Sequence, residues 1–166
     1  MLVYHPAYDL NHGMFRMLRL LEKHPQKAMK WDTFRILDLY YLFPHLLGDA
    51  QWPGSMTKRK REFAKQGSKY TRVPSPKIFI QQIRGSHEAI ARSLIAKGFI
   101  EPVQFNNGNL VRSPLPLPTA LTDAFSSSHD QVLVDMLATE IALLPLTGTN
   151  GLKVRTGLLE HRYDAA

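Results

Sequence analysis

The sequence contains no cysteine. This excludes a disulfide scaffold, a cysteine nucleophile and thiolate metal sites, and it is typical of a reducing compartment. There is also no run of eighteen apolar residues, so we expect no membrane span. The first residues, Met-Leu-Val-Tyr-His-Pro, lack the charged region and the apolar core of a secretory signal. Together these absences predict a cytoplasmic protein.

Sequence motifs for catalysis, nucleotide binding and metal binding are missing as well. The seven histidines are scattered without His-Glu-x-x-His or a comparable spacing, and no Walker or dinucleotide glycine pattern occurs. Residues 126–130 (Ser-Ser-Ser-His-Asp) include the residue types of a catalytic triad, but sequence neighbours rarely converge in a triad. We interpret this run as the start of a helix. The sequence therefore predicts a protein that is not an enzyme and that holds no metal and no cofactor.

The composition is that of an ordinary globular chain, with 44% hydrophobic and 21% charged residues among 166. This length predicts a single domain, 1–166, which buries enough surface to fold without a metal or a disulfide. The net charge of +7 is local, because residues 58–77 hold eight Lys or Arg against one acid, Glu62. A local patch of this kind binds nucleic-acid phosphates or an acidic protein surface.

Apolar periodicity predicts two N-terminal helices within residues 9–47. Asp9 is the expected N-cap of a helix over 9–24, and a denser apolar pattern over 31–47 predicts a core helix that Pro44 stops or kinks.

The next segment, 48–77, is a basic connecting arm with helical character around 58–66. It is longer than most loops within a domain, which suggests a binding role or disorder in the free protein.

Residues 76–113 have the pattern of a winged-helix element. We expect two helices or one kinked helix over 76–97, which Gly98 ends, and then a β-hairpin of strands 99–105 and 110–113 around an Asn-Gly turn. The helical residues expected to face inward are Ile83, Ala89, Ile90, Leu94 and Ile95. A helix followed by a hairpin is the order of a recognition helix and its wing. The predicted fold class is therefore mainly α with a small β-hairpin, winged-helix-like.

Beyond Pro114, alternating prolines predict an extended polyproline II linker. An amphipathic helix over 129–144 is expected to begin a C-terminal helical extension, 129–166.

The basic residues are the best candidates for a functional surface. Few side chains suited to base edges lie on the expected recognition helix, which favours non-specific contact with the DNA backbone. A solvated loop without a ligand, or a contact with an acidic protein, would explain the same charges. The candidate DNA-binding residues are Lys58, Arg59, Lys60, Arg61, Lys65, Lys69, Arg72, Arg84 and Arg92.

The segment Arg35-Ile-Leu-Asp-Leu-Tyr-Tyr-Leu-Phe-Pro44, with the opening His5-Pro-Ala-Tyr-Asp9 and the Phe15-Arg16 helix, resembles the middle components of bacterial ABC three-component systems. These systems include the Lamassu-type anti-phage and anti-plasmid operons. In that family a small protein is encoded between an SMC-like ABC ATPase and an effector, often a nuclease.

The resemblance implies a winged-helix, kleisin- or KITE-like accessory subunit without catalytic residues, which docks on the ATPase and helps to hold the effector. It implies structural or docking roles, with Arg35 and Asp38 capping or pairing, for His5, Asp9, Arg16, Arg35, Asp38, Tyr40 and Pro44. Two other classes stay open: a stand-alone winged-helix regulator that binds DNA, and a small hydrolase or nuclease.

Overall fold

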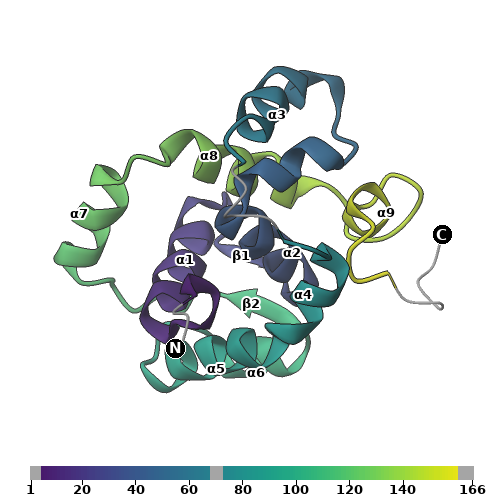
Figure 1. Cartoon of the computed structure of the whole chain (residues 1–166). Helices are drawn as coiled ribbons and strands as arrows, with labels where there is room; N and C mark the ends of the chain where they lie inside the picture. Colours follow the sequence, from purple (N-terminus) through teal and green to yellow (C-terminus); the bar gives the residue numbers. More distant parts are fainter. Residues whose placement is uncertain (1–4, 68–72, 161–166) are drawn as a thin grey trace.

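Two helices, α1 (Leu10–Lys23) and α2 (Trp31–Leu42), form the centre of the protein (Figure 1). The computed structural model describes residues 5–67 and 73–160. A short 3-10 helix, η1 (Pro6–Tyr8), precedes α1, and the Asp9 side chain accepts a hydrogen bond from the His12 amide, as expected of an N-cap. Consecutive residues 33–40 of α2 are all buried, which confirms the predicted core helix.

Pro44 ends the α2 region as predicted and begins the 3-10 helix η2 (Pro44–Asp49). The arm that follows is packed rather than loose, because it carries its own apolar anchors. It forms η3 (Gly54–Met56) and α3 (Thr57–Ala64), with α3 lying against η2. The side chains that hold it to the core are those of Trp52, Met56 and Phe63. Disorder of the arm is therefore wrong for its described part.

The predicted pair of helices over 76–97 is confirmed as α4 (Pro76–Gln82) and α5 (Arg84–Ala96). Four of the five residues expected to face inward are buried or half-buried, but Ala89 is exposed and Ala91 takes its place in the core. Gly98 follows with a φ of +82°, a value that glycine adopts without a steric cost, so it ends the helix as predicted.

The small sheet differs in part from the predicted hairpin. Strand β2 (Asn109–Val111) pairs antiparallel with β1 (Ala28–Lys30), which lies between α1 and α2. On its far side β2 continues into an isolated bridge between Ile100 and Arg112, which keeps a remnant of the predicted pairing.

A strand over the whole of 99–105 is wrong, because Pro102–Asn106 forms the short helix α6. Pro102 stands at the first turn of α6, where its fixed φ and missing amide proton favour a helix start. The fold class itself, mainly α with one small antiparallel β pair, is confirmed.

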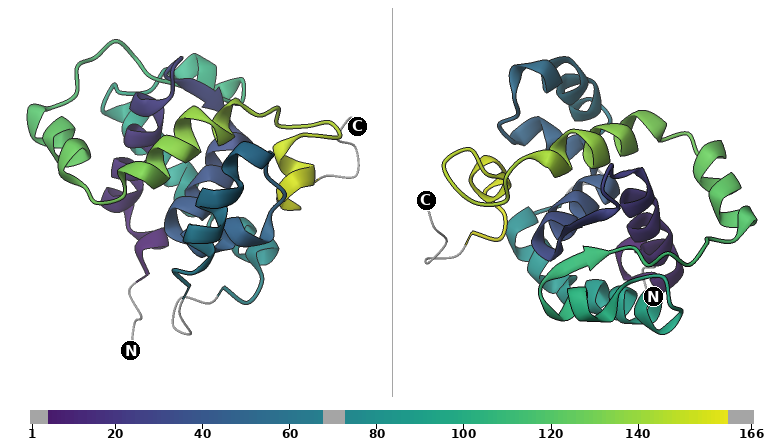
Figure 2. Two further views of the ribbon diagram at one scale, coloured as in Figure 1. Left: turned by 90° about the horizontal axis from the view of Figure 1, so that it is seen from above. Right: turned by 180° about the vertical axis from the view of Figure 1, so that it is seen from behind.

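The C-terminal third wraps around α1 and α2 (Figure 2). Helix α7 (Thr119–Ser127), which the sequence did not predict, lies at the edge of the molecule and has no fully buried residue, although Phe125 packs against Phe15 of α1. The expected helix over 129–144 is shorter: α8 (Gln131–Thr139) gives way to the 3-10 helix η5 (Ile141–Leu143), and α9 (Leu152–Thr156) follows. Among the helices in the described parts of the chain, none is long and apolar enough to cross a membrane.

Gly13 lets α1 approach α5 closely. A Cβ atom at Gly13 would lie 2.1 Å from Ile90 Cδ1 and 2.7 Å from Ile90 Cγ1, so Gly13→Ala is expected to destabilise the fold by about 1–3 kcal/mol. Gly85→Ala is the matched control: a Cβ there meets no described atom within 4 Å, and we expect a gain of about 0.4–1 kcal/mol. Urea unfolding of both variants measures the difference, and equal gains would contradict the close contact.

Candidate functional site

A fully buried ion pair joins three helices at the centre of the protein. Asp38 of α2 accepts hydrogen bonds from Arg16 of α1, with Nε at 2.6 Å and Nη2 at 3.1 Å. The Nε2 atom of His87, on α5, lies 3.0 Å from Asp38 Oδ2, the oxygen that Arg16 Nη2 also contacts. All three side chains are buried, so the cluster joins α1, α2 and α5 in the interior of the protein.

The Asp38 carboxyl is ionised in spite of its burial. Burial by itself raises the pKa of a carboxyl group, but the charge of Arg16 and the hydrogen bonds from His87 and Arg16 outweigh it and lower the pKa of Asp38 to about 2. The negative charge is therefore part of the folded structure at neutral pH.

The other residues that the resemblance singled out also make contacts within the fold. Arg35 does not pair with Asp38: it donates to the Ile80 carbonyl at 2.9 Å, and its Nη1 lies 3.5 Å from Asp32. Lys153 of α9 reaches the same Asp32 at 3.2 Å, so this second pair ties α2 to α4 and α9. The remaining four act in the N-terminal turns and the core: His5 and Asp9 as caps, Tyr40 against Trp52, and Pro44 at the start of η2.

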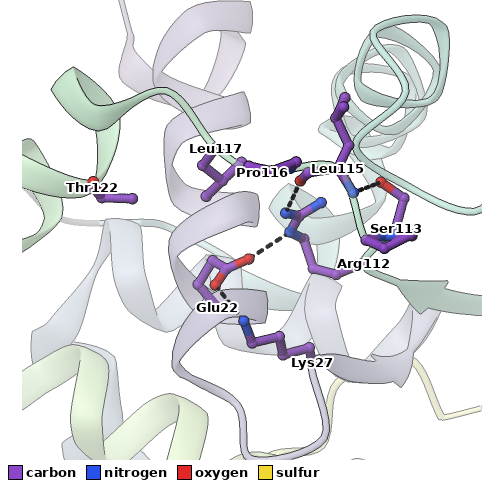
Figure 3. A pocket seen from close by; sticks show the side chains of 9 residues that line it. Glu22, Lys27, Arg112, Ser113, Leu115, Pro116, Leu117 and Thr122 are labelled. Carbon is purple, nitrogen blue, oxygen red and sulfur yellow. Dashed lines mark hydrogen bonds and ion pairs between the residues drawn. The ribbon is translucent and has the colours of Figure 1, made fainter.

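A hollow of about 520 Å³ lies beside the segment that leaves β2 (Figure 3). Its charged lining consists of Glu22, Lys27 and Arg112. Lys27 Nζ lies 2.9 Å and Arg112 Nε 2.6 Å from the Glu22 carboxylate. Partial burial alone would raise the pKa of Glu22, but the hydrogen bonds from these two cations lower it. The hollow therefore carries more positive than negative charge.

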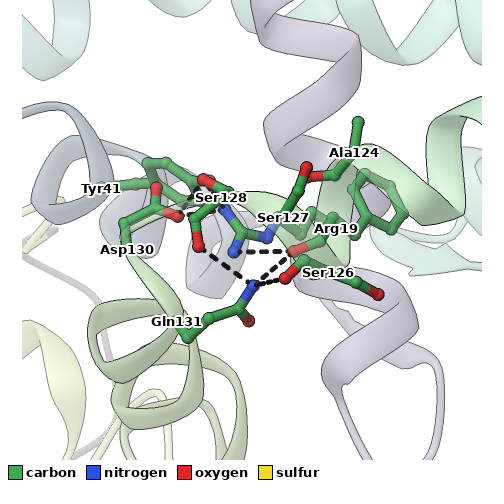
Figure 4. A network of polar contacts seen from close by, with 9 residues as sticks. Arg19, Tyr41, Ala124, Ser126, Ser127, Ser128, Asp130 and Gln131 are labelled. Atoms are coloured by element: carbon green, nitrogen blue, oxygen red, sulfur yellow. Dashed lines mark hydrogen bonds and ion pairs between the residues drawn. The ribbon is translucent and has the colours of Figure 1, made fainter.

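Arg19 holds the C-terminal third to α1 (Figure 4). This buried side chain forms an ion pair with Asp130 and donates hydrogen bonds to Tyr41 Oη at 2.7 Å, Ser128 Oγ at 3.2 Å and the Phe125 carbonyl at 3.3 Å. Burial alone raises the pKa of Asp130, but the hydrogen bonds from Ser128 and Arg19 lower it. Ser126 and Ser127 are the last residues of α7, and Asp130 stands at the N-cap position of α8 without a side-chain capping bond. Only the end of the run 126–130 is therefore the helix start expected from sequence, and Arg19 stabilises this junction.

The basic helix α3 divides its cations between two tasks. Arg59 forms an ion pair with Glu140, at the end of α8, and Lys60 Nζ donates to the Ala50 carbonyl at 2.6 Å. Lys58, Arg61 and Lys65 are exposed and, at spacings of three and four residues, lie on one face of the helix. Glu62, next to them, is the acid of this region.

The structure does not bring all the candidate DNA-binding residues together. Arg84 and Arg92 are exposed on α5, and Arg84 pairs with Glu88 at 3.0 Å. Helices α3 and α5 lie at opposite ends of the molecule (Figures 1 and 2). Lys69 and Arg72 lie outside the described residues. The candidates therefore belong to two separate surfaces, of which α3 has the greater density of exposed cations.

Sequence reasoning missed two residues of the buried clusters, His87 and Arg19. His87 lies on an exposed-looking stretch of alternating small and polar residues, with no local signal of its contact with Asp38. Arg19 gives a weak signal, since it comes one turn after Arg16 within a strongly amphipathic helix. In residues 5–67 and 73–160, no three His, Cys, Asp or Glu side chains lie close enough to hold a metal ion.

Comparison with known proteins leads to the same family that the N-terminal residues resemble. No curated protein and no solved structure matches the chain. One family model, described as ABC-three component (ABC-3C) system Middle Component 5, matches residues 2–164, which is nearly the whole chain. The chain therefore belongs to the family of ABC-three component system Middle Component 5 proteins.

Proposed function

We propose that the chain is a non-catalytic accessory subunit that bridges an SMC-like ABC ATPase and an effector nuclease in a DNA-sensing, Lamassu-type bacterial defence complex. In this role it is cytoplasmic and contacts the DNA backbone without sequence preference. Membership of a middle-component family supports a place between two other components. The single observation that carries the DNA contact is the exposed cationic face of α3.

The absence of catalysis is supported by the contacts of two carboxylates, the buried Asp38 and the half-buried Asp130. Asp38 is enclosed by Arg16 and His87, and Asp130 is held by Arg19 and Ser128. Hydrolytic centres need carboxylates that contact a metal, a water or the substrate. Both of these carboxylates are used to join helices.

Contact with the DNA backbone is supported by the way in which α3 is held on the body of the protein. Its ion pair from Arg59 to Glu140 and the buried ring of Phe63 hold the helix on the body, while Lys58, Arg61 and Lys65 span about 10 Å along its open face. Lysine and arginine contacts to phosphates supply most of the affinity of non-specific DNA binding, and they do not read bases.

The second candidate, a stand-alone winged-helix regulator, is favoured by the order of elements. Helix α1, strand β1, helices α2, α4 and α5, the bridge at Ile100 and strand β2 occur in this order, with α3 and α6 as additional helices, and β2 lies between β1 and Ile100. This reading makes α5 the recognition helix and predicts duplex binding with a sequence preference.

Two matched triple variants separate these functions. We expect Lys58→Ala/Arg61→Ala/Lys65→Ala to weaken duplex binding and to reduce the slope of log K against log salt by about 2.7, because three phosphate contacts are lost. Arg84→Ala/Arg92→Ala/Lys97→Ala removes the same charge from α5 and should leave the slope almost unchanged. Fluorescence anisotropy at several salt concentrations, with two unrelated duplexes, provides the measurement.

The reverse pattern, with a preference for one duplex that the α5 variant abolishes, would favour the regulator. Co-expression with the ATPase and effector components tests the bridging role. A chain that elutes alone as a stable monomer in size-exclusion chromatography would contradict it.

A further inference from the structure

The segment Ser113–Pro118 is restricted to an extended conformation by its covalent chemistry. Prolines at 114, 116 and 118 fix their own φ angles near −65°, and each residue that precedes a proline is kept out of the helical region. Pro118 has φ −56° and ψ 139°, which are polyproline II values. The prolines also lack amide protons, so the segment cannot continue β2 as a fully paired strand.

The segment is fixed at its base by hydrogen bonds. Arg112, itself paired with Glu22, donates from Nη1 to the Phe99 carbonyl at 2.5 Å and from Nη2 to the Leu115 carbonyl at 2.8 Å (Figure 3). Ser113 Oγ donates to the Gly98 carbonyl at 2.5 Å and accepts from the Leu115 amide at 3.3 Å. A simple spacer needs no such anchoring, whereas a binding segment gains affinity when its conformation is set in advance.

The side chains of the segment face different ways. A polyproline II helix has three residues per turn, so Leu115 and Pro118 share one edge and Pro116 lies on the next. Leu117 packs against the core, but Leu115 is 44% exposed and Pro116 and Pro118 are exposed too. The segment thus presents a leucine–proline ridge to the outside.

A positive charge lies next to this ridge. The hollow beside it is lined by Lys27 and Arg112 against the single carboxylate of Glu22. The Lys27 side chain is more than half exposed and accessible to an acidic group.

We propose that the ridge of Leu115, Pro116 and Pro118 is a docking ligand for a groove on a partner component, lined by aromatic side chains and flanked by a carboxylate. Grooves of that kind bind preformed polyproline II segments through the apolar ridge and the free backbone carbonyls. The carboxylate of the groove pairs with Lys27. This inference rests on the proposed function, because the partner is the ATPase or the effector of the same system.

The test uses the full-length chain and the purified ATPase and effector components, with affinities measured by isothermal titration calorimetry. Leu115→Asp places a carboxylate on the ridge and is expected to weaken binding to one component by about tenfold or more. Pro116→Ala keeps the side chain small and apolar but frees the backbone, and should weaken the same binding several-fold. The matched control is Val154→Asp, since Val154 is 54% exposed on α9, on the opposite side of the molecule from α7.

Binding to a component that both ridge variants weaken and Val154→Asp does not would support the docking ligand. Equal binding by the wild type and both ridge variants would overturn it and leave the bridging function intact. If the wild type binds neither component, the bridging function itself fails, and this inference fails with it. Self-association of the wild type that Leu115→Asp abolishes would assign the ridge to a second copy of the chain and overturn a partner groove. Thermal unfolding by circular dichroism checks that each variant is folded.

Discussion

Asp38→Ala is expected to destabilise the chain by about 3–5 kcal/mol, which is a large part of the stability of a domain of this size. The reason is the charge that it leaves behind. Arg16 is buried with Asp38 as its carboxylate partner, and His87 loses the same contact. A buried guanidinium without a counter-charge costs far more than the deletion of a methyl group. Urea unfolding followed by circular dichroism measures the loss.

Asp38→Asn keeps the shape and tests the charge alone. The pKa of Asp38 is lowered to about 2 in the folded chain, below its value of about 3.9 in an unfolded one. The carboxylate therefore stabilises the fold above pH 4, and this stabilisation is lost as the pH falls towards 2. Asp38→Asn should lack this part of the acid dependence, whereas Asp123→Asn, on the exposed face of α7, should retain it. An unchanged acid profile in Asp38→Asn would contradict the role of the charge.

Arg19→Met is expected to lower the free energy of unfolding by about 2–3 kcal/mol and to increase local opening of the C-terminal third. Methionine keeps the apolar stem but loses the ion pair with Asp130 and the hydrogen bonds to Tyr41, Ser128 and the Phe125 carbonyl. The cost is smaller than for Asp38 because the Asp130 side chain is 33% exposed and regains water. Hydrogen exchange should show lower protection in 119–139 than in the wild type.

Lys23→Met is the matched control for Arg19→Met. Lys23 lies on the same helix and pairs with Asp135 of α8, but both side chains of that pair are 46% exposed. Exposed pairs contribute about 0–1 kcal/mol, so protection in α7 and α8 should hardly change. Full protection of these helices in Arg19→Met would show that apolar contacts alone hold them.

Elements whose ends depend on local chemistry could be predicted from sequence. Asp9 caps α1, Pro44 ends the α2 region and Gly98 ends α5, and each of these effects acts within a few residues. The alternation of apolar and polar residues over 99–105 indicated a strand, but Pro102 starts a helix and β2 pairs with β1, some eighty residues earlier. Pairing over that distance leaves no mark in local periodicity.

The candidate site was predictable to the same extent. The charge density of 58–65 identifies α3 as a basic element. Sequence does not show that Lys58 is exposed whereas Arg59 is paired, because the partner of Arg59 is Glu140, 81 residues further along the chain. Helix α7 was missed because it has only nine residues, is rich in serine and threonine, and is only half-buried on one side.

The separation of α3 from α5 and β2 has a consequence for how the protein would hold its ligands. Duplex DNA along α3 at one end leaves the other end uncovered, where β2 continues into the proline ridge (Figure 1). With both proposed contacts in place, the DNA and the docked component would bind without competing, and the docked component would gain a high effective concentration at the DNA. A chain of this size would thereby couple DNA binding to the docking of a component by proximity alone, with no change of its own conformation.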